Sequence, residues 1–272
     1  MSWYTHANPF DGTTKWIWSS EGIAGPRPDT GRYRIRHFRR VFDAPTNARL
    51  IIHVSADSRY RLWCNGREAA FGPAKGDIEH HFFETVDVSS LLCNGRNVLA
   101  ATVEYYGDCW SETTCGAPCS RMTARPGFVM RGTVVGPDEK PLEDVHTDRR
   151  WRVLVDRSLQ YQDDGIYTNS IGGSEHLDCA LFPWDFQVRD YDDSAWPEAT
   201  ETVPAVSDTW HQWAVSPHRL VPRMIAPLEM SEPRRFTDII SKVLENDAAD
   251  WQHLIAGMGT VTIPAHSSLT VI

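Results

Sequence analysis

Short apolar runs separated by Gly, Pro and Asn recur along most of the chain. Residues 50–56 form one such run, rich in β-branched side chains, which is typical of a buried strand. Between residues 59 and 64, Tyr, Leu and Cys alternate with Arg and Trp, and this period of two predicts a strand with one face turned inward. Asn65-Gly66 follows and predicts a hairpin turn, because both residues tolerate positive φ. The returning strand is expected over residues 67–71.

Further strands are predicted where apolar runs recur, over residues 98–105, 128–135 and 151–155. Asp87 stands before a short stretch that it can cap as one helical turn. Many short strands with turn residues between them, and little helical periodicity before residue 230, predict an all-β sandwich.

The late part of the chain has a different pattern. A Pro-rich stretch over residues 216–233 predicts a connection between domains. Apolar side chains at positions 236, 239, 240, 243 and 244 then predict a helix, and residues 260–272 begin new β structure. We therefore expect a first domain over residues 1–215 and, over 216–272, a linker with the incomplete start of a second β-domain. The sequence is interpreted as a fragment of a longer protein.

Charge and hydropathy exclude several kinds of partner. The formal net charge is −9, which argues against binding to a phosphate backbone. No apolar run approaches the roughly 20 residues that a membrane-spanning helix needs. The first residues have neither the basic start nor the apolar core of a secretory signal. We therefore expect a cytoplasmic protein that binds neither nucleic acid nor membrane, with its six cysteines reduced.

Aromatic residues are abundant, with 11 Trp, 8 Tyr and 10 Phe. This excess fits either a heavy β core or contact with the apolar faces of sugars. By contrast, the motifs of nucleotide-binding loops, serine hydrolases and zinc peptidases are absent from the sequence. Glycoside hydrolysis needs two carboxylates across a sugar-sized cleft, and the sequence alone nominates no pair among its 36 acidic residues.

Several segments, taken in order, carry a resemblance to a known family. They are Trp-Ile-Trp at 16–18, Ala-Asp-Ser-Arg-Tyr-Arg-Leu-Trp-Cys-Asn-Gly at 56–66, Gly-Pro-Ala-Lys-Gly-Asp at 72–77, Asp-Tyr-Asp-Asp-Ser-Ala-Trp at 190–196 and Ile-Pro-Ala-His-Ser from 263. Together they resemble the N-terminal region of bacterial and fungal α-L-rhamnosidases of glycoside hydrolase family 78. The resemblance runs over nearly the whole chain and implies a galactose-binding-like jelly roll.

The resemblance also implies what this chain does not contain. In the family, inverting hydrolysis of terminal α-L-rhamnose resides in an (α/α)6 barrel that follows the β-domains. We therefore expect a non-catalytic, carbohydrate-binding-like accessory region that is inactive alone. Its parent would act on rhamnose-containing glycosides without a required cofactor.

Five residues are candidates for sugar contact. Tyr105, Tyr106 and Trp110 end a strand and enter a long loop, where aromatic side chains are common at ligand sites. Some related jelly rolls bind rhamnose with calcium through a segment like Ile-Tyr-x-Gly-Glu-x-x-Asp. The resemblance of residues 165–178 to that segment implies Glu175 and Asp178 as sugar-binding and calcium-binding residues. The same carboxylates can instead bond to backbone or to an Arg and stabilise the loop.

Two other function classes stay open. A stand-alone lectin-like module would bind rhamnose or galactose saturably. A structural domain that forms homo-oligomers would instead associate in a concentration-dependent way without sugar affinity.

Overall fold

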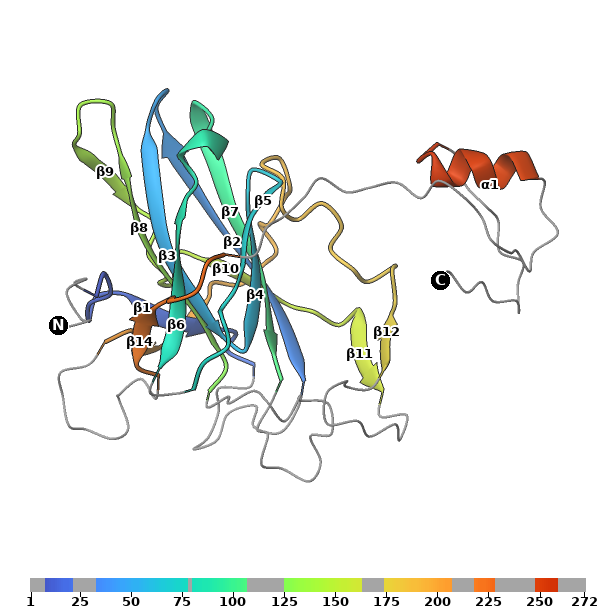
Figure 1. Ribbon diagram of the computed structural model, residues 1–272, viewed down its shortest axis with the longest axis horizontal. Coiled ribbons are helices and arrows are strands. Elements are labelled where there is room, and N and C mark those ends of the chain that lie inside the picture. Colours follow the sequence, from blue (N-terminus) through green and yellow to red (C-terminus); the bar gives the residue numbers. More distant parts are fainter. Residues whose placement is uncertain are drawn as a thin grey trace. The chain divides into compact units, whose positions relative to one another are not determined.

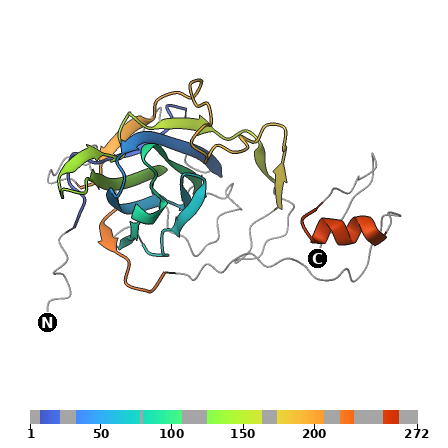
Figure 2. The same cartoon turned by 90° about the horizontal axis from the view of Figure 1, so that it is seen from above.

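The structure is a computed structural model that describes residues 8–21, 33–77, 80–106, 125–162, 174–206, 218–227 and 248–258. The chain divides into two compact units, Met1–Ile225 and Ala226–Ile272. All strands of the described residues lie in the first unit, shown in Figures 1 and 2. This unit is an all-β sandwich, as predicted from the spacing of apolar runs and turn residues.

Two large sheets form the sandwich. Their strands are β1 (Lys15–Trp18), β2 (Arg34–Ala44), β3 (Arg49–Asp57), β4 (Arg59–Cys64), β5 (Arg67–Gly72), β6 (His81–Asp87), β7 (Gly95–Tyr105), β8 (Gly127–Val135), β9 (Pro141–Asp144), β10 (Arg152–Val155), β13 (Thr200–Pro204) and β14 (Leu220–Pro222). The seven-stranded sheet has the order β13-β1-β8-β3-β6-β14, with β9 paired to β8. The five-stranded sheet has the order β10-β2-β7-β4-β5. A separate two-stranded ribbon pairs β11 (Leu159–Gln162) with β12 (Ser174–Leu177).

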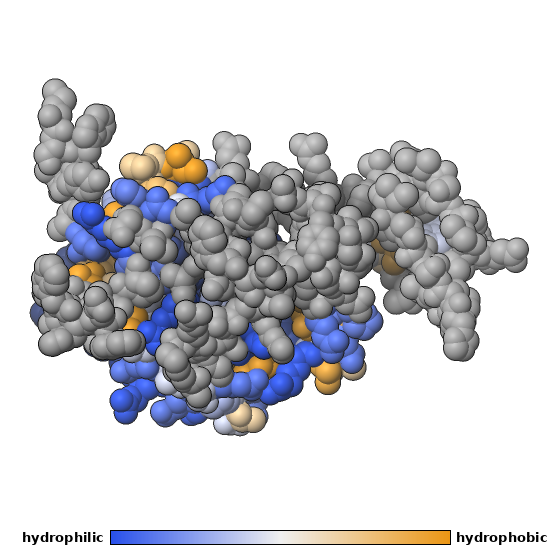
Figure 3. Space-filling model, turned by 90° about the horizontal axis from the view of Figure 1, so that it is seen from below, coloured by the Kyte–Doolittle hydropathy of each residue, from blue (hydrophilic) through white to orange (hydrophobic). Residues whose placement is uncertain are grey.

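The core lies between the two sheets. Strand side chains alternate between faces, so Tyr60, Leu62 and Cys64 of β4 point inward and are buried. Phe38 of the five-stranded sheet stacks on Phe128 of the seven-stranded sheet, with ring centroids 5.4 Å apart. Many of the abundant aromatic residues therefore pack the interior, as in other sandwich cores. On the coloured part of the face in Figure 3, hydrophobic residues form small separate patches among hydrophilic ones.

The predicted hairpin between β4 and β5 is confirmed. Asn65 and Gly66 have φ values of 52° and 79°, as a turn with two left-handed residues requires. The Asn65 side chain also donates to the Leu91 carbonyl at 2.9 Å and accepts from the Val98 amide at 2.9 Å. The turn is therefore fixed to the neighbouring segments as well as to its own strands.

The short helical turn is also present, as η1 (Ser89–Leu91). The Asp87 carboxylate accepts a hydrogen bond from the Ser89 amide at 2.9 Å. The N-cap residue of this turn is Val88, which makes no side-chain cap hydrogen bond. Asp87 therefore lies one residue before the cap position predicted for it, and its carboxylate stabilises the entry to the turn instead.

A segment of turns over residues 178–199 covers part of the outer face of the five-stranded sheet. Arg39 of β2 is fully buried beneath it. Its guanidinium bonds to the Asp193 carboxylate at 2.8 Å, to the Phe186 carbonyl, and to the Val188 carbonyl at 3.1 Å. Trp196 packs beside Phe186 on the same face. One buried cation therefore anchors most of this covering segment.

The first unit ends shortly after β14, which pairs in parallel with β6 at the edge of the seven-stranded sheet. In the second unit the structure describes one helix, α1 (Ala248–Ile255). The helix predicted around residues 236–244 and the β structure predicted over 260–272 lie outside the described residues. No helix among the described residues is long and apolar enough to cross a membrane. Three cysteines, Cys64, Cys93 and Cys179, are free thiols.

Candidate functional site

The aromatic candidates at the end of β7 have different environments. Tyr105 is fully buried, and its ring meets Trp18 in a T-shaped contact at 6.5 Å, so it belongs to the core. Tyr106 is half-buried and stacks on Tyr33 at 5.7 Å. Its hydroxyl donates to Glu104 at 3.1 Å. Trp110 lies outside the described residues.

The two acidic candidates lie at and after β12. Glu175 belongs to this strand, and its side chain lies outside the described part. Asp178 is exposed, and its carboxylate accepts a hydrogen bond from the Ala180 amide at 3.0 Å. Its own amide donates to the Ser158 carbonyl at 2.7 Å. Asp178 therefore stabilises the turn that leaves the ribbon.

Calcium takes six to eight oxygen ligands, which is a larger set than the described residues assemble near Asp178. Across the described ranges, no group of three or more His, Cys, Asp or Glu side chains lies close enough to hold a metal ion. The calcium site expected at Glu175 and Asp178 stays a prediction, because the Glu175 side chain lies outside the described part.

A cleft of about 410 Å³ lies on the outer face of the five-stranded sheet, beside the covering segment. Its volume falls in the range of small-molecule sites, roughly 300–1,000 Å³. The outward positions of β4 and β7 supply one wall, and the covering segment supplies the other. The residues that characterise it are Arg59, Arg61, Trp63, Glu104, Phe182 and Gln187.

The base of the cleft contains a buried polar pair, His37 and Asp156. The imidazole Nε2 lies 2.8 Å from the Asp156 carboxylate, and both side chains are 1% exposed. Burial alone would raise the pKa of Asp156, but hydrogen bonds from His37 and Ser158 outweigh burial and lower the pKa to about 2. The other ring nitrogen of His37 lies 3.0 Å from the Thr102 hydroxyl. Asp156 is thus ionised at neutral pH, and its carboxylate is hydrogen-bonded to His37 and Ser158.

The mouth of the cleft is aromatic and charged. Trp63 meets the Phe186 ring in a T-shaped contact at 5.6 Å. Arg59 faces Glu104 across the β4–β7 ladder, and both side chains reach the surface. The alternation along residues 59–64 predicted that Arg59, Arg61 and Trp63 point outward, and this is confirmed.

Sequence reasoning missed the other wall. Phe182 and Phe186 come from a stretch that reads Leu-Phe-Pro-Trp-Asp-Phe from residue 181. Three aromatic side chains within five residues, placed just after Asp178, were the available signal. The aromatic positions 182, 184 and 186 alternate, but Pro183 interrupts the run and disfavours a strand there.

A second polar cluster is buried where β5, β6 and β14 meet. Glu84 accepts hydrogen bonds from the Tyr60 hydroxyl at 2.7 Å, from the Ala74 amide at 2.7 Å and from Arg223 at 3.1 Å. Burial raises the pKa of Glu84, and these three donors oppose the increase. Gly72 must stay small here, because a Cβ would lie 2.5 Å from the Glu84 carboxylate.

The neighbouring pair is Asp57 with His218. Their side chains lie 2.8 Å apart and are 1% and 2% exposed. His218 also stacks on Trp16, with ring centroids 4.7 Å apart, and Asp57 accepts from the Arg125 amide at 3.1 Å. These buried contacts connect segments far apart in the sequence and fix the last part of the first unit to the sheet.

The molecule thus belongs to the class of β-sandwich domains with a ligand-sized cleft on one sheet face. Residues 44–231 match the family described as Alpha-L-rhamnosidase N-terminal domain, so the chain belongs to this family. The match confirms the family inferred from the motifs at 56–66, 72–77 and 190–196.

Solved structures agree with this assignment. The GH78 family rhamnosidase of Bacillus sp. GL1 is 26% identical, with a TM-score of 0.58, and the match covers 79% of this chain and 20% of that one. The α-L-rhamnosidase from Dictyoglumus thermophilum is 16% identical, with a TM-score of 0.56, and covers 80% of this chain and 23% of that one. The second likeness shows the fold alone. This chain spans about a fifth of the length of either enzyme. No curated protein matches the sequence.

Proposed function

We propose that this chain is the non-catalytic N-terminal accessory region of a glycoside hydrolase that acts on rhamnose-containing glycosides. The family match over residues 44–231 carries the proposal. The similarity to a Bacillus rhamnosidase over a fifth of that enzyme's length supports it. In this role the sandwich supports or orients a catalytic site built by other polypeptide.

The carboxylates of the described residues support an accessory role. A glycosidase needs a general acid whose pKa is raised, facing a second carboxylate across the sugar. In the cleft, Asp156 has a lowered pKa and is bound to His37. The carboxyl with a raised pKa, Glu84, is buried elsewhere and bound by three donors. Asp156, at the base of the cleft, is therefore an ionised group held by its partners and not a protonated acid poised over a ligand.

Turnover tests the proposal directly. The purified chain is incubated with p-nitrophenyl α-L-rhamnopyranoside, and release of p-nitrophenol is followed by its absorbance. We expect no release above the buffer rate, with an active α-L-rhamnosidase as the positive control. Release that is retained through a second purification and scales with protein concentration would contradict the proposal.

A further inference from the structure

We infer that the cleft on the outer face of the five-stranded sheet binds a neutral pyranose ring of a glycan. This inference goes beyond the proposed function, because an accessory region can support a catalytic site without a ligand of its own. The cleft has the volume of a small-molecule site and is lined by both aromatic and charged side chains. The aromatic and charged side chains on its walls then indicate which class of ligand it suits.

Aromatic rings form the apolar surface of the cleft. Trp63 is partly exposed, and its contact with Phe186 fixes the indole in place. Phe182 lies against His37 with ring centroids 5.6 Å apart, so its position is fixed as well. A pyranose ring has an apolar face of C–H groups that packs on such rings, and rings that are already ordered lose little entropy on binding.

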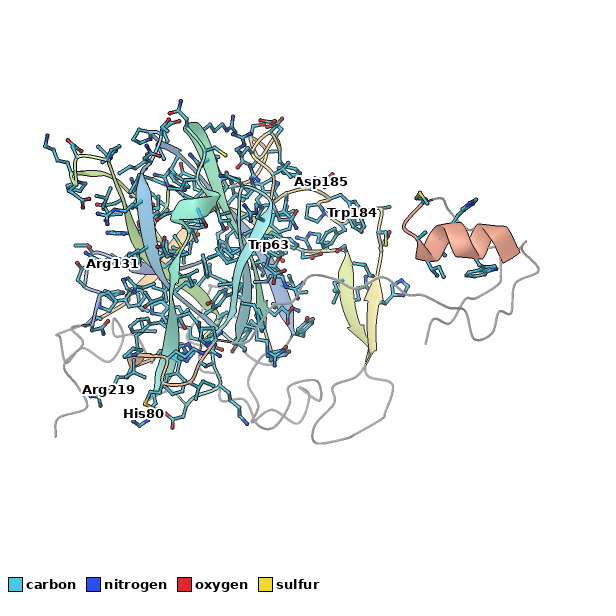
Figure 4. The ribbon with its side chains drawn as sticks, turned by 45° about the horizontal axis from the view of Figure 1, so that its top comes forward. Trp63, His80, Arg131, Trp184, Asp185 and Arg219 are labelled. Carbon is cyan, nitrogen blue, oxygen red and sulfur yellow. The ribbon has the colours of Figure 1, made fainter. Side chains whose placement is uncertain are left out.

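Trp184 extends this aromatic surface beyond the cleft. Its side chain is 57% exposed, although its indole N–H donates to the Cys179 carbonyl at 2.8 Å and its ring contacts Phe182 at 4.8 Å. Figure 4 shows Trp63 on the sheet and Trp184 with Asp185 on the segment beside it. An exposed tryptophan that is held in one orientation is a feature of ligand surfaces, since a core role would bury it.

The charged groups at the mouth favour a neutral ligand rich in hydroxyls. Arg59 supplies donors only, and Glu104 supplies acceptors only. Among the described side chains Arg59 has no ion-pair partner, and Glu104 has one hydrogen bond, from Tyr106. A sugar hydroxyl both donates and accepts, so it can use the two groups together.

The balance of charge argues against an anionic ligand. Arg59 stands opposite Glu104 across the ladder, and Arg61 lies 3.5 Å from Glu68. Each cation near the mouth therefore has a carboxylate beside it. A ligand carrying its own carboxylate would meet repulsion from these groups as well as attraction.

Calorimetry tests the inference. The whole chain is titrated with methyl α-L-rhamnopyranoside, methyl β-D-galactopyranoside and sodium glucuronate. We expect saturable binding of at least one neutral glycoside, with a dissociation constant on the order of 1 mM, and weaker binding of glucuronate. Arg59→Ala and Glu104→Gln should each weaken binding by about tenfold or more, which corresponds to a loss of roughly 1.4 kcal/mol.

Arg219→Ala is the matched control, because Arg219 is an exposed arginine next to β14 of the other sheet, and Figure 4 shows it away from Trp63. This control should bind as the parent chain does. Thermal unfolding of each variant shows whether lost binding reflects lost folding. Since Arg59 and Glu104 are at the surface, both variants are expected to fold.

Three results would overturn the inference. The first is no saturable heat with either neutral glycoside, and the second is tighter binding of glucuronate. The third is binding that Arg59→Ala leaves unchanged while Asp178→Ala abolishes it, which would place the sugar at the loop after β12. Turnover by the purified chain would contradict the proposed function but would not contradict sugar binding at the cleft. The failure of one can therefore be told from the failure of the other.

Discussion

The outer faces of the two sheets differ, although their strands have the same alternating pattern. On the five-stranded sheet, Ile35 is 7% exposed and Arg39 is fully buried. On the seven-stranded sheet, Ile51 holds an equivalent outward position and is 51% exposed. The difference is local to these positions. Residues 178–199 cover Arg39, and Ile51 is left open to solvent, whereas Val129 on the same face of the seven-stranded sheet is buried beside Phe10 and Phe83. Alternation therefore defines which side chains face outward, whereas a distant segment decides which of those are buried.

The hollows on these two faces differ in the side chains that line them. The depression on the seven-stranded sheet has a volume of about 320 Å³, close to that of the cleft, and is lined by side chains such as Ile51, His53 and Arg131. Only the cleft on the five-stranded sheet has Trp and Phe side chains in its lining, within the described residues. The two hollows are thus similar in volume but differ in the ligands that they suit, because the covering segment supplies aromatic side chains to the cleft alone of the two.

The largest expected effect comes from removing the anchor of the covering segment. Arg39→Met should lower the free energy of unfolding by about 3–5 kcal/mol, because Asp193 and three carbonyls lose a buried cationic partner. Urea denaturation of the chain measures this change. Arg49→Met is the matched control on the other sheet, since the Arg49–Glu139 pair is exposed and should contribute at most about 1 kcal/mol. Equal losses in the two variants would show that the segment does not depend on Arg39.

A pair of isoleucines sharpens the comparison. Ile35→Ala removes methyl groups from a covered position and should cost about 2–3 kcal/mol. Ile51→Ala makes the same change on the open face and should cost well under 1 kcal/mol, because that side chain is already half solvated. The two midpoints of urea unfolding, measured side by side, report the difference. Similar midpoints would contradict a difference in burial between Ile35 and Ile51.

A smaller effect depends on pH. The pKa of Asp156 is about 2 in the folded chain, below its ordinary value of 3.8, so ionisation of Asp156 stabilises the fold above about pH 4. This contribution is lost as the pH falls from about 4 toward 2. Asp156→Asn should therefore destabilise the chain by roughly 1–2 kcal/mol at pH 7, and the difference should shrink near pH 2. A difference that stays constant over pH 2–7 would contradict a lowered pKa.

Local chemistry made much of the sandwich predictable. The β4–β5 hairpin follows from the alternation over 59–64 and from Asn65-Gly66, whose φ values are the expected ones. The sequence reading did not single out β2 or β6. In β2 four arginines interrupt the apolar pattern, and two of them are buried. Arg36 lies over the Trp18 ring, and Arg39 is bonded by the covering segment. Such positions depend on partners far along the chain.

The site was predictable only in part, for the same reason. The outward Arg59, Arg61 and Trp63 follow from period-two alternation, but Phe182 and Phe186 reach the cleft through a segment without regular structure. Tyr105 was expected at a ligand site and lies in the core, because it occupies an inward position of β7. A sequence identifies a residue as aromatic and near a strand end, whereas burial is set by strand register.

The parallel pairing of β14 with β6 has a consequence for stability against aggregation. A sheet edge with unpaired amides and carbonyls is a template for joining other chains. Leu220–Pro222 occupies that edge, and Arg223 secures it through Glu84. A shorter polypeptide ending before His218 would expose the backbone of Phe82 and Phe83 to neighbouring molecules, so it should self-associate even though most of the core would remain.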